Sequence, residues 1–213
     1  MASTLSKTIF DYTLTDELSA DKSITRQQAE SLFDFFRQSD LFRWKDGNND
    51  CEDRANAICI LLDEWNIPNY KGWVFSGYFY KNTSGSLINF WNYHVAALLP
   101  VDENNTIKYY ILDPATADNL VDINNWAASI TDIPYSYNFI KHSSYYIFSG
   151  RKIGKDNWYK RNKRNFRWTM QGLSGINGMS CIGKAQLSFK KERVKATERA
   201  FIKLKHNKPP FVQ

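Results

Sequence analysis

The sequence predicts an α+β fold in which two helices precede an antiparallel sheet. Two observations support this fold class: apolar residues recur at helical spacing in two segments before residue 66, and β-type runs separated by short polar turns follow from residue 72. The chain has 213 residues, of which 43% are hydrophobic and 15% aromatic. This content is enough for one compact domain with a substantial core.

Two helices are expected first. Residues 24–39 carry apolar residues on one helical face, and Thr25 is a plausible N-cap. Residues 41–50 are rich in turn-forming residues and are expected to form a loop. A second helix is expected to begin near Cys51 and to end before Pro68.

The sheet is expected to be an antiparallel meander, because its β-type runs are joined by short polar turns. The expected strands are 72–80, 88–101, 107–114 and 142–150, with one turn at residues 102–106. Further helices are expected at 120–130 and 187–205.

Charge divides the chain into two parts. Residues 1–150 hold 11 Lys and Arg against 19 Asp and Glu, whereas residues 151–168 hold eight against one and residues 184–208 hold nine against two. We therefore expect a catalytic core at 1–150 and a basic C-terminal region at 151–213, packed on the same domain.

The basic region also supports a function of another class. Its cations are interleaved with Trp158, Tyr159, Phe166 and Trp168, a composition typical of phosphate contacts combined with base stacking. A module that binds nucleic acid or another anionic surface is thus an alternative function. The plainer interpretation is that the basic segments pack on the acidic front half of the chain and keep their charged side chains in solvent.

Cysteine content and hydropathy indicate in which cellular compartment the protein is made. Cys51, Cys59 and Cys181 are too few for a disulfide framework and form no C-x-x-C pair, so we expect a reduced protein with neither metal nor cofactor. No run approaches 18 apolar residues, and residues 1–10 lack the apolar core of a signal peptide. We expect a protein that is cytoplasmic as synthesised, with any export by a signal-independent secretion system.

Cys51 is the candidate nucleophile. At a helix start, unpaired backbone N–H groups and the helix dipole favour a thiolate and lower the thiol pKa. The neighbours Asp50, Glu52 and Asp53 act against this effect, because negative charge raises a thiol pKa. A cationic His94 would have to offset them.

His94 and Asp113 are the candidate base and orienting group. Each alone is more typical of a structural residue, since His94 lies in an apolar strand and Asp113 precedes Pro114. If the two strands pair around a turn at 102–106, residues whose numbers add up to about 207 lie opposite one another. His94 and Asp113 meet this condition, and cross-strand partners lie close enough for the carboxylate to hold the imidazole Nδ1–H. A thiol at a helix start, with base and orienter on adjacent strands, is the geometry of papain-like enzymes.

Several motifs extend this pattern: S-L-F at 31–33, C-x-x-R-A at 51–55, W-N-Y-H-V-A at 91–96 and I-L-D-P at 111–114. In order and spacing they resemble the protein-glutaminase family, secreted bacterial enzymes with a papain/transglutaminase-like fold. The resemblance implies that Cys51 is the nucleophile, His94 the general base and acid, and Asp113 the orienter. It also implies deamidation of protein glutamine through a thioester, so a protein with an exposed Gln is the expected substrate.

The chain differs from the family in features linked to secretion and not in the residues of the triad. The family's enzymes carry disulfides and a pro-region, whereas this chain has few cysteines and no evident pro-segment. An intracellular relative or a delivered bacterial effector is therefore expected, with an inhibitor or immunity protein as a further partner.

The same triad also serves transglutaminases and cysteine proteases, which remain alternatives because the triad does not specify the acceptor. The Cys51 backbone N–H is the expected first oxyanion donor. Trp44 and Trp91 are candidates for the second, although a role as pocket wall or core is the plainer interpretation of either.

Overall fold

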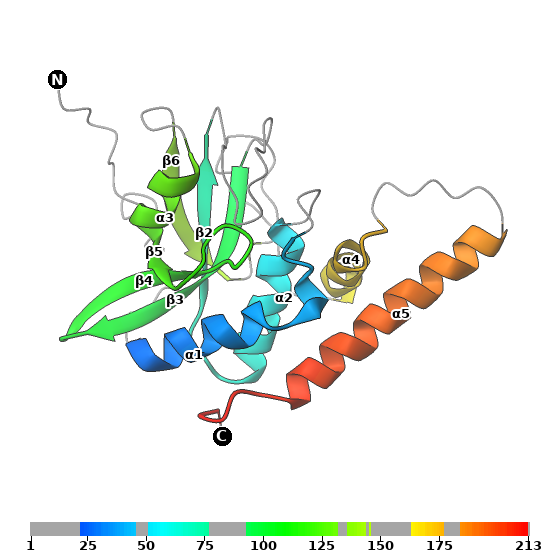
Figure 1. Ribbon diagram of the computed structural model, residues 1–213, viewed down its shortest axis with the longest axis horizontal. Coiled ribbons are helices and arrows are strands. Elements are labelled where there is room, and N and C mark those ends of the chain that lie inside the picture. Colours follow the sequence, from blue (N-terminus) through cyan, green and yellow to red (C-terminus); the bar gives the residue numbers. More distant parts are fainter. Residues whose placement is uncertain are drawn as a thin grey trace.

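A computed structural model describes residues 22–45, 51–76, 93–131, 136–143, 145, 163–176 and 184–212. All structural statements below refer to these residues. Figure 1 shows a twisted sheet with helices on both faces and a long C-terminal helix alongside.

A six-stranded sheet forms the centre of the molecule, in the order β5-β4-β3-β2-β6, and β1 pairs in parallel with β3. The other pairs are antiparallel, and for β2–β3 and β3–β4 this was predicted from the polar turns. The strands are β1 (Ile24–Thr25), β2 (Tyr70–Phe75), β3 (Tyr93–Glu103), β4 (Thr106–Leu112), β5 (Val121–Asp122) and β6 (Tyr137–His142).

The sheet separates two apolar layers, because successive strand residues point to opposite faces. One layer joins the sheet to α1 (Arg26–Arg37) and α2 (Cys51–Glu64), and it includes Ala97, Leu99 and Val101 of β3. The other joins it to α3 (Ile123–Ile130) and includes Ala96 and Leu98 of β3. In Figure 1, α2 and α3 accordingly lie on opposite sides of the strands.

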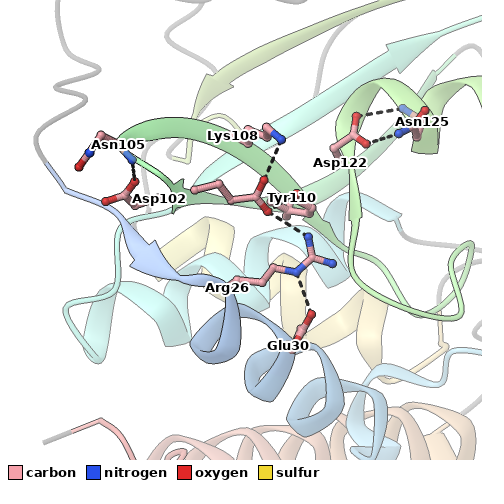
Figure 2. Close-up of polar contacts among 9 residues, drawn as sticks. Arg26, Glu30, Asp102, Asn105, Lys108, Tyr110, Asp122 and Asn125 are labelled. Carbon is pink, nitrogen blue, oxygen red and sulfur yellow. Dashed lines mark hydrogen bonds and ion pairs between the residues drawn. The ribbon is translucent and has the colours of Figure 1, made fainter.

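Helix α1 begins at the predicted N-cap. The Thr25 hydroxyl accepts the Gln28 backbone N–H, and the Gln28 side chain accepts that of Thr25. The helix is tied to the β3–β4 hairpin through Arg26, which bonds Glu30 and Glu103 and stacks on the Tyr110 ring (Figure 2). Lys108 and Tyr110 also donate to Glu103, and these contacts lower the pKa of that carboxyl to about 2.

The C-terminal helices α4 (Lys163–Leu173) and α5 (Lys184–His206) pack beside α2. Met170, Leu173 and Phe201 join the same apolar cluster as α1 and α2, and Phe166 packs edge-on against Phe201. The N-terminal part of α5 is exposed, with Leu187 at 45% and Phe189 at 50%. Of the predicted aromatic platform, Trp168 is exposed, whereas Trp158 and Tyr159 lie outside the described residues.

Several predicted elements need correction. The second strand of the meander begins at Tyr93 among the described residues and runs to Glu103, and the next ends at Leu112, so that Asp113 follows the strand. The strand predicted at 142–150 is instead β6, which ends at His142, because residues 137–142 pair with β2; residues 146–150 lie outside the description. The start of the predicted 120–130 helix is the short strand β5.

A short 3₁₀ turn, η2 (Asp40–Phe42), occupies the start of the predicted loop, and residues 46–50 are not described. None of the described helices is both long and apolar enough to span a membrane.

Candidate active site

Cys51 is the first residue of α2, as the sequence predicted. It is 8% exposed and packs with Ala55, Trp73, Phe75 and Val95. The Val95 backbone N–H forms a hydrogen bond to the thiol, so the sulfur rests against strand β3 at the residue after His94. The predicted N-cap, Asp50, lies outside the described residues.

His94 and Asp113 are in direct contact. His94 Nε2 lies 2.7 Å from Asp113 Oδ2, and the two residues are only 1% and 4% exposed. Burial raises the pKa of Asp113, but attraction to His94 and hydrogen bonds from His94 and Thr116 outweigh it, so the net pKa is lowered. Asp113 is therefore ionised at neutral pH, a state in which it can orient the imidazole.

The register that brings them together differs from the predicted one. Ala97 pairs with Leu112 and Glu103 with Thr106, so opposite residues add up to 209 rather than 207. His94 is thus a diagonal neighbour of Asp113 and not its cross-strand partner. Because the error is two residues, both side chains remain on the same face of the sheet.

The ring nitrogen also differs from the prediction. Asp113 binds Nε2 of His94 rather than Nδ1. The nitrogen on the other side of the ring, Nδ1, is the one that a reacting group would use, and it is buried.

Two residues that the sequence analysis did not single out support Asp113. The Thr116 hydroxyl donates to Asp113 Oδ2, and Trp126 Nε1 donates to Thr116 Oγ1 at 2.7 Å. The Trp126 ring also lies 5.5 Å from the His94 ring. Thr116 sits three residues after Asp113 in D-P-A-T, a spacing typical of a side-chain-bonded turn, but nothing local in the sequence indicates Trp126.

The electrostatics of Cys51 contradict the expected lowering of its pKa. Burial raises the thiol pKa well above its ordinary value, and the charge and hydrogen bond of Glu52 raise it further. The thiol donates to Glu52 Oε2 at 3.2 Å. The Val95 N–H acts in the opposite direction and does not offset the two larger effects. Cys51 is therefore a protonated thiol in the resting site.

Trp44 does not offer its N–H to an oxyanion, because Trp44 Nε1 donates to the Phe36 carbonyl at 2.9 Å. Its ring stacks on Phe42. Trp91, the other candidate, lies outside the described residues.

Arg54 of the C-x-x-R-A motif holds the segment before α2 in place. Its guanidinium donates to the carbonyl oxygens of Phe42 and Arg43, each at 2.9 Å, and it is 7% exposed. It ties the segment before α2 to the helix and also helps to lower the pKa of Asp113. In the described part of the chain, no group of three or more His, Cys, Asp or Glu side chains could hold a metal ion.

Comparisons with known proteins identify the class. Residues 29–130, which include Cys51, His94 and Asp113, match the model of a family described as glutaminase. These residues belong to the glutaminase family. A search of curated proteins by sequence gives no match.

Solved structures agree on the fold. The NMR structure of protein-glutaminase from Chryseobacterium proteolyticum is similar with a TM-score of 0.55 and 17% identity, over 77% of this chain and 92% of that one. A crystal structure of protein-glutaminase gives 0.56 and 17%, over 76% and 92%. A crystal structure of pro-protein-glutaminase gives 0.59 and 17%, over 79% and 65%.

The predicted papain/transglutaminase-like α+β fold and the predicted family are thereby confirmed. The glutaminase match also confirms the predicted class of enzyme, one that hydrolyses a glutamine side-chain amide.

Proposed function

We propose that this glutaminase-family chain deamidates glutamine side chains in proteins, with Cys51 as nucleophile, His94 as general base and acid, and Asp113 as the group that orients His94. The main support is the buried 2.7 Å contact between His94 and Asp113, one residue from the strand position that bonds the Cys51 thiol. The protein substrate is inferred from the structures of similar fold, which are protein-glutaminases.

The end of β4 supplies the place where the three groups would meet. β4 stops opposite Ala97, so among the described strands the part of β3 that holds His94 pairs only with β2. Val95 faces the α2 side with Cys51, while His94 contacts Trp126 on the α3 side. At the open strand edge, a thiol from one face and an imidazole from the other can approach each other.

The proposed reaction has two halves. His94 Nδ1 takes the thiol proton, the sulfur attacks the carboxamide carbon, and ammonia leaves with the proton from His94, which gives a thioester. His94 then takes a proton from water, the hydroxide attacks the thioester, and the thiol leaves with that proton as glutamate forms. The Cys51 backbone N–H at the start of α2 is the first donor to the oxyanion.

Transglutaminase and protease activities use the same first half and differ in the acceptor or the bond attacked. A glutamine-containing protein such as casein, assayed for ammonia, cross-linking and fragmentation together, separates the three. We expect ammonia release without cross-links or fragments, lost in Cys51→Ala and His94→Ala. Cross-linked or cleaved product in place of ammonia would overturn deamidation.

The basic C-terminal region, residues 151–213, is proposed as an accessory to a catalytic core at 1–150. Its α4 contributes Thr169, which accepts a hydrogen bond from Asn56 of α2, so the region supports the helix that begins at Cys51. Binding of an anionic partner there stays a prediction. A salt-dependent affinity for nucleic acid or anionic vesicles that survives Cys51→Ala would support it.

Delivery as a bacterial effector by a signal-independent route, with an inhibitor or immunity protein that masks the site, also stays a hypothesis. It is motivated by the few cysteines, of which the described Cys51 and Cys59 are free thiols. Detection of the protein only inside the producing cells would contradict it.

A further inference from the structure

The Cys51 sulfur has a negatively charged neighbour that the proposed reaction does not use. Glu52, the next residue of α2, places Oε2 3.2 Å from the sulfur and is half-buried. The Tyr93 side chain forms a second hydrogen bond to this carboxylate. Tyr93 is itself held by ring contacts with Trp73 and Phe75, at centroid distances of 5.4 and 5.6 Å. The Glu52 carboxylate is therefore fixed from two sides beside the reacting atom.

The Glu52 carboxylate lies as close to the sulfur as a reacting substrate group must come. A carbonyl carbon attacked by sulfur has to come within about 3–3.5 Å of it. The substrate of the proposed reaction brings a neutral carboxamide to that place, and the product leaves a carboxylate there. Two carboxylates at one site repel each other, so a fixed Glu52 discriminates between substrate and product by charge.

The other charged groups around the thiol do not cancel this effect. The charge of Asp113, after β4, raises the pKa of the thiol further although Asp113 is engaged by His94, and Asp53 of α2 adds negative charge beside Tyr93. Two buried cations lie on the α2 side. Lys71 of β2 is attracted by Glu52 and Asp53, but its Nζ donates to Asn56 and to the Tyr145 carbonyl, and Arg54 of α2 donates to two backbone carbonyls. The raised pKa of Cys51, due first to burial and then to Glu52, is consistent with this balance.

We propose that Glu52 is a specificity-determining residue: its carboxylate, held by Tyr93 beside the Cys51 sulfur, accepts a hydrogen bond from the thiol and excludes a second carboxylate, so that the site accepts a neutral amide and releases the acid. The part that concerns the product rests on the proposed function. The part that concerns the thiol does not, and it can be measured without any substrate.

The experiment compares two alkylating reagents that differ only in charge, neutral iodoacetamide and anionic iodoacetate. Modification of Cys51 is followed across pH by peptide mass spectrometry in the full chain, for the wild type, Glu52→Gln and Tyr93→Phe. Glu64→Gln is the matched control, because it makes the same change at the other end of α2, where Glu64 bonds Lys205.

In the wild type, the midpoint of Cys51 alkylation is expected above that of an unperturbed thiol, about 8.5. Glu52→Gln is expected to lower this midpoint by about one unit, which makes alkylation at pH 7 about tenfold faster. It is also expected to reduce the preference for iodoacetamide over iodoacetate by about three- to tenfold, because the repulsion of the anion is removed. Tyr93→Phe should shift both readouts in the same direction and by less.

A wild-type midpoint at or below that of an unperturbed thiol would overturn the proposal, even if the variants fail to fold. An unchanged midpoint or reagent preference in Glu52→Gln relative to Glu64→Gln would also overturn it. Inhibition by the deamidated product protein, measured in the ammonia assay, should be stronger in Glu52→Gln than in the wild type. If no ammonia is released while the reagent preference shifts as expected, the proposed function fails and the role of Glu52 at the thiol stands.

Discussion

His94 Nε2 and Asp113 Oδ2 lie 2.7 Å apart with both side chains buried, although the two residues are not opposite each other in the β3–β4 ladder. Asp113 reaches His94 diagonally because it follows the last residue of β4. It is held there by Thr116, which in turn accepts from Trp126 of α3. The orientation of the imidazole thus depends on the turn after β4 and on α3.

Asp113→Ala should lower the rate of ammonia release by about 10²–10⁴-fold, because an imidazole without its orienting carboxylate is a poor base and acid. The rate is measured with a glutamine-containing protein at saturating concentration. Asp118→Ala is the matched control, since Asp118 is exposed in the same loop, and it should leave the rate unchanged. Asp113→Ala with more than half of the wild-type rate would contradict the role of Asp113.

Thr116→Val should move the acid limb of the pH–activity profile to higher pH. The hydrogen bond from Thr116 helps to lower the pKa of Asp113, so its removal lets that pKa rise and Asp113 takes up a proton at a higher pH. Thr197→Val, which removes a hydroxyl bonded within α5, is the control. An acid limb that does not move, at any level of activity, would show that Thr116 is not coupled to Asp113.

Lys71 gives a prediction about stability at alkaline pH. It is fully buried, and burial lowers its pKa from 10.5 to about 8. Between these two pH values the unfolded chain binds more protons than the folded one, so the free energy of unfolding rises with pH. The contribution of neutral Lys71 is complete above pH 10.5 and is lost as pH falls through about 8. The full difference is on the order of 3 kcal/mol.

In Lys71→Met this increment should be absent, so the free energy of unfolding in urea should gain less between pH 8 and 10.5 than in the wild type. Lys195→Met, on the exposed face of α5, should keep the wild-type slope. Equal slopes in the wild type and Lys71→Met would mean that Lys71 titrates normally in the folded protein.

Gly172→Ala tests the packing of the C-terminal region on the core. A Cβ at residue 172 of α4 would lie 1.7 Å from Asp53 Oδ2, so the substitution forces the carboxylate or the helix to move. We expect a loss of about 1–3 kcal/mol in the free energy of unfolding. The loss should be smaller in an Asp53→Ala background, and additive losses in this double-mutant cycle would contradict the contact.

The sequence predicted those features that depend on local patterns. The capping pair Thr25 and Gln28 fixes the start of α1, and the change from a loop to helical spacing places Cys51 at the start of α2. The strand order β2–β3–β4 follows from polar turns between β-type runs.

The register was wrong because the D-E-N-N-T stretch offers several turn centres. The structure uses the two residues Asn104 and Asn105, which both have positive φ and so form the tight turn that suits a hairpin. Asp113 therefore reaches His94 diagonally, with the faces of the strands unchanged.

The sequence predicted that the charge of Glu52 raises the pKa of Cys51, but it could not predict the larger effect of burial. The helix start at Cys51 suggests a lowered thiol pKa, and only the structure shows the sulfur shielded and bonded to Glu52. Lys71 lies just before the strand expected at 72–80, and nothing in the sequence indicates that it is buried, yet the packing of α2 over β2 buries it completely. Trp126 comes to the site from α3, at a separation that no local pattern reveals.

The central claim is tested most directly by the intact mass of a glutamine-containing substrate protein after reaction in ¹⁸O-labelled and ordinary water. Deamidation through a Cys51 thioester predicts a gain of about 1 Da per event in ordinary water and about 3 Da in labelled water, because water supplies one oxygen to each new carboxylate. Cys51→Ala should give neither gain. An unchanged mass with wild-type protein, or a gain that persists in Cys51→Ala, would contradict the account.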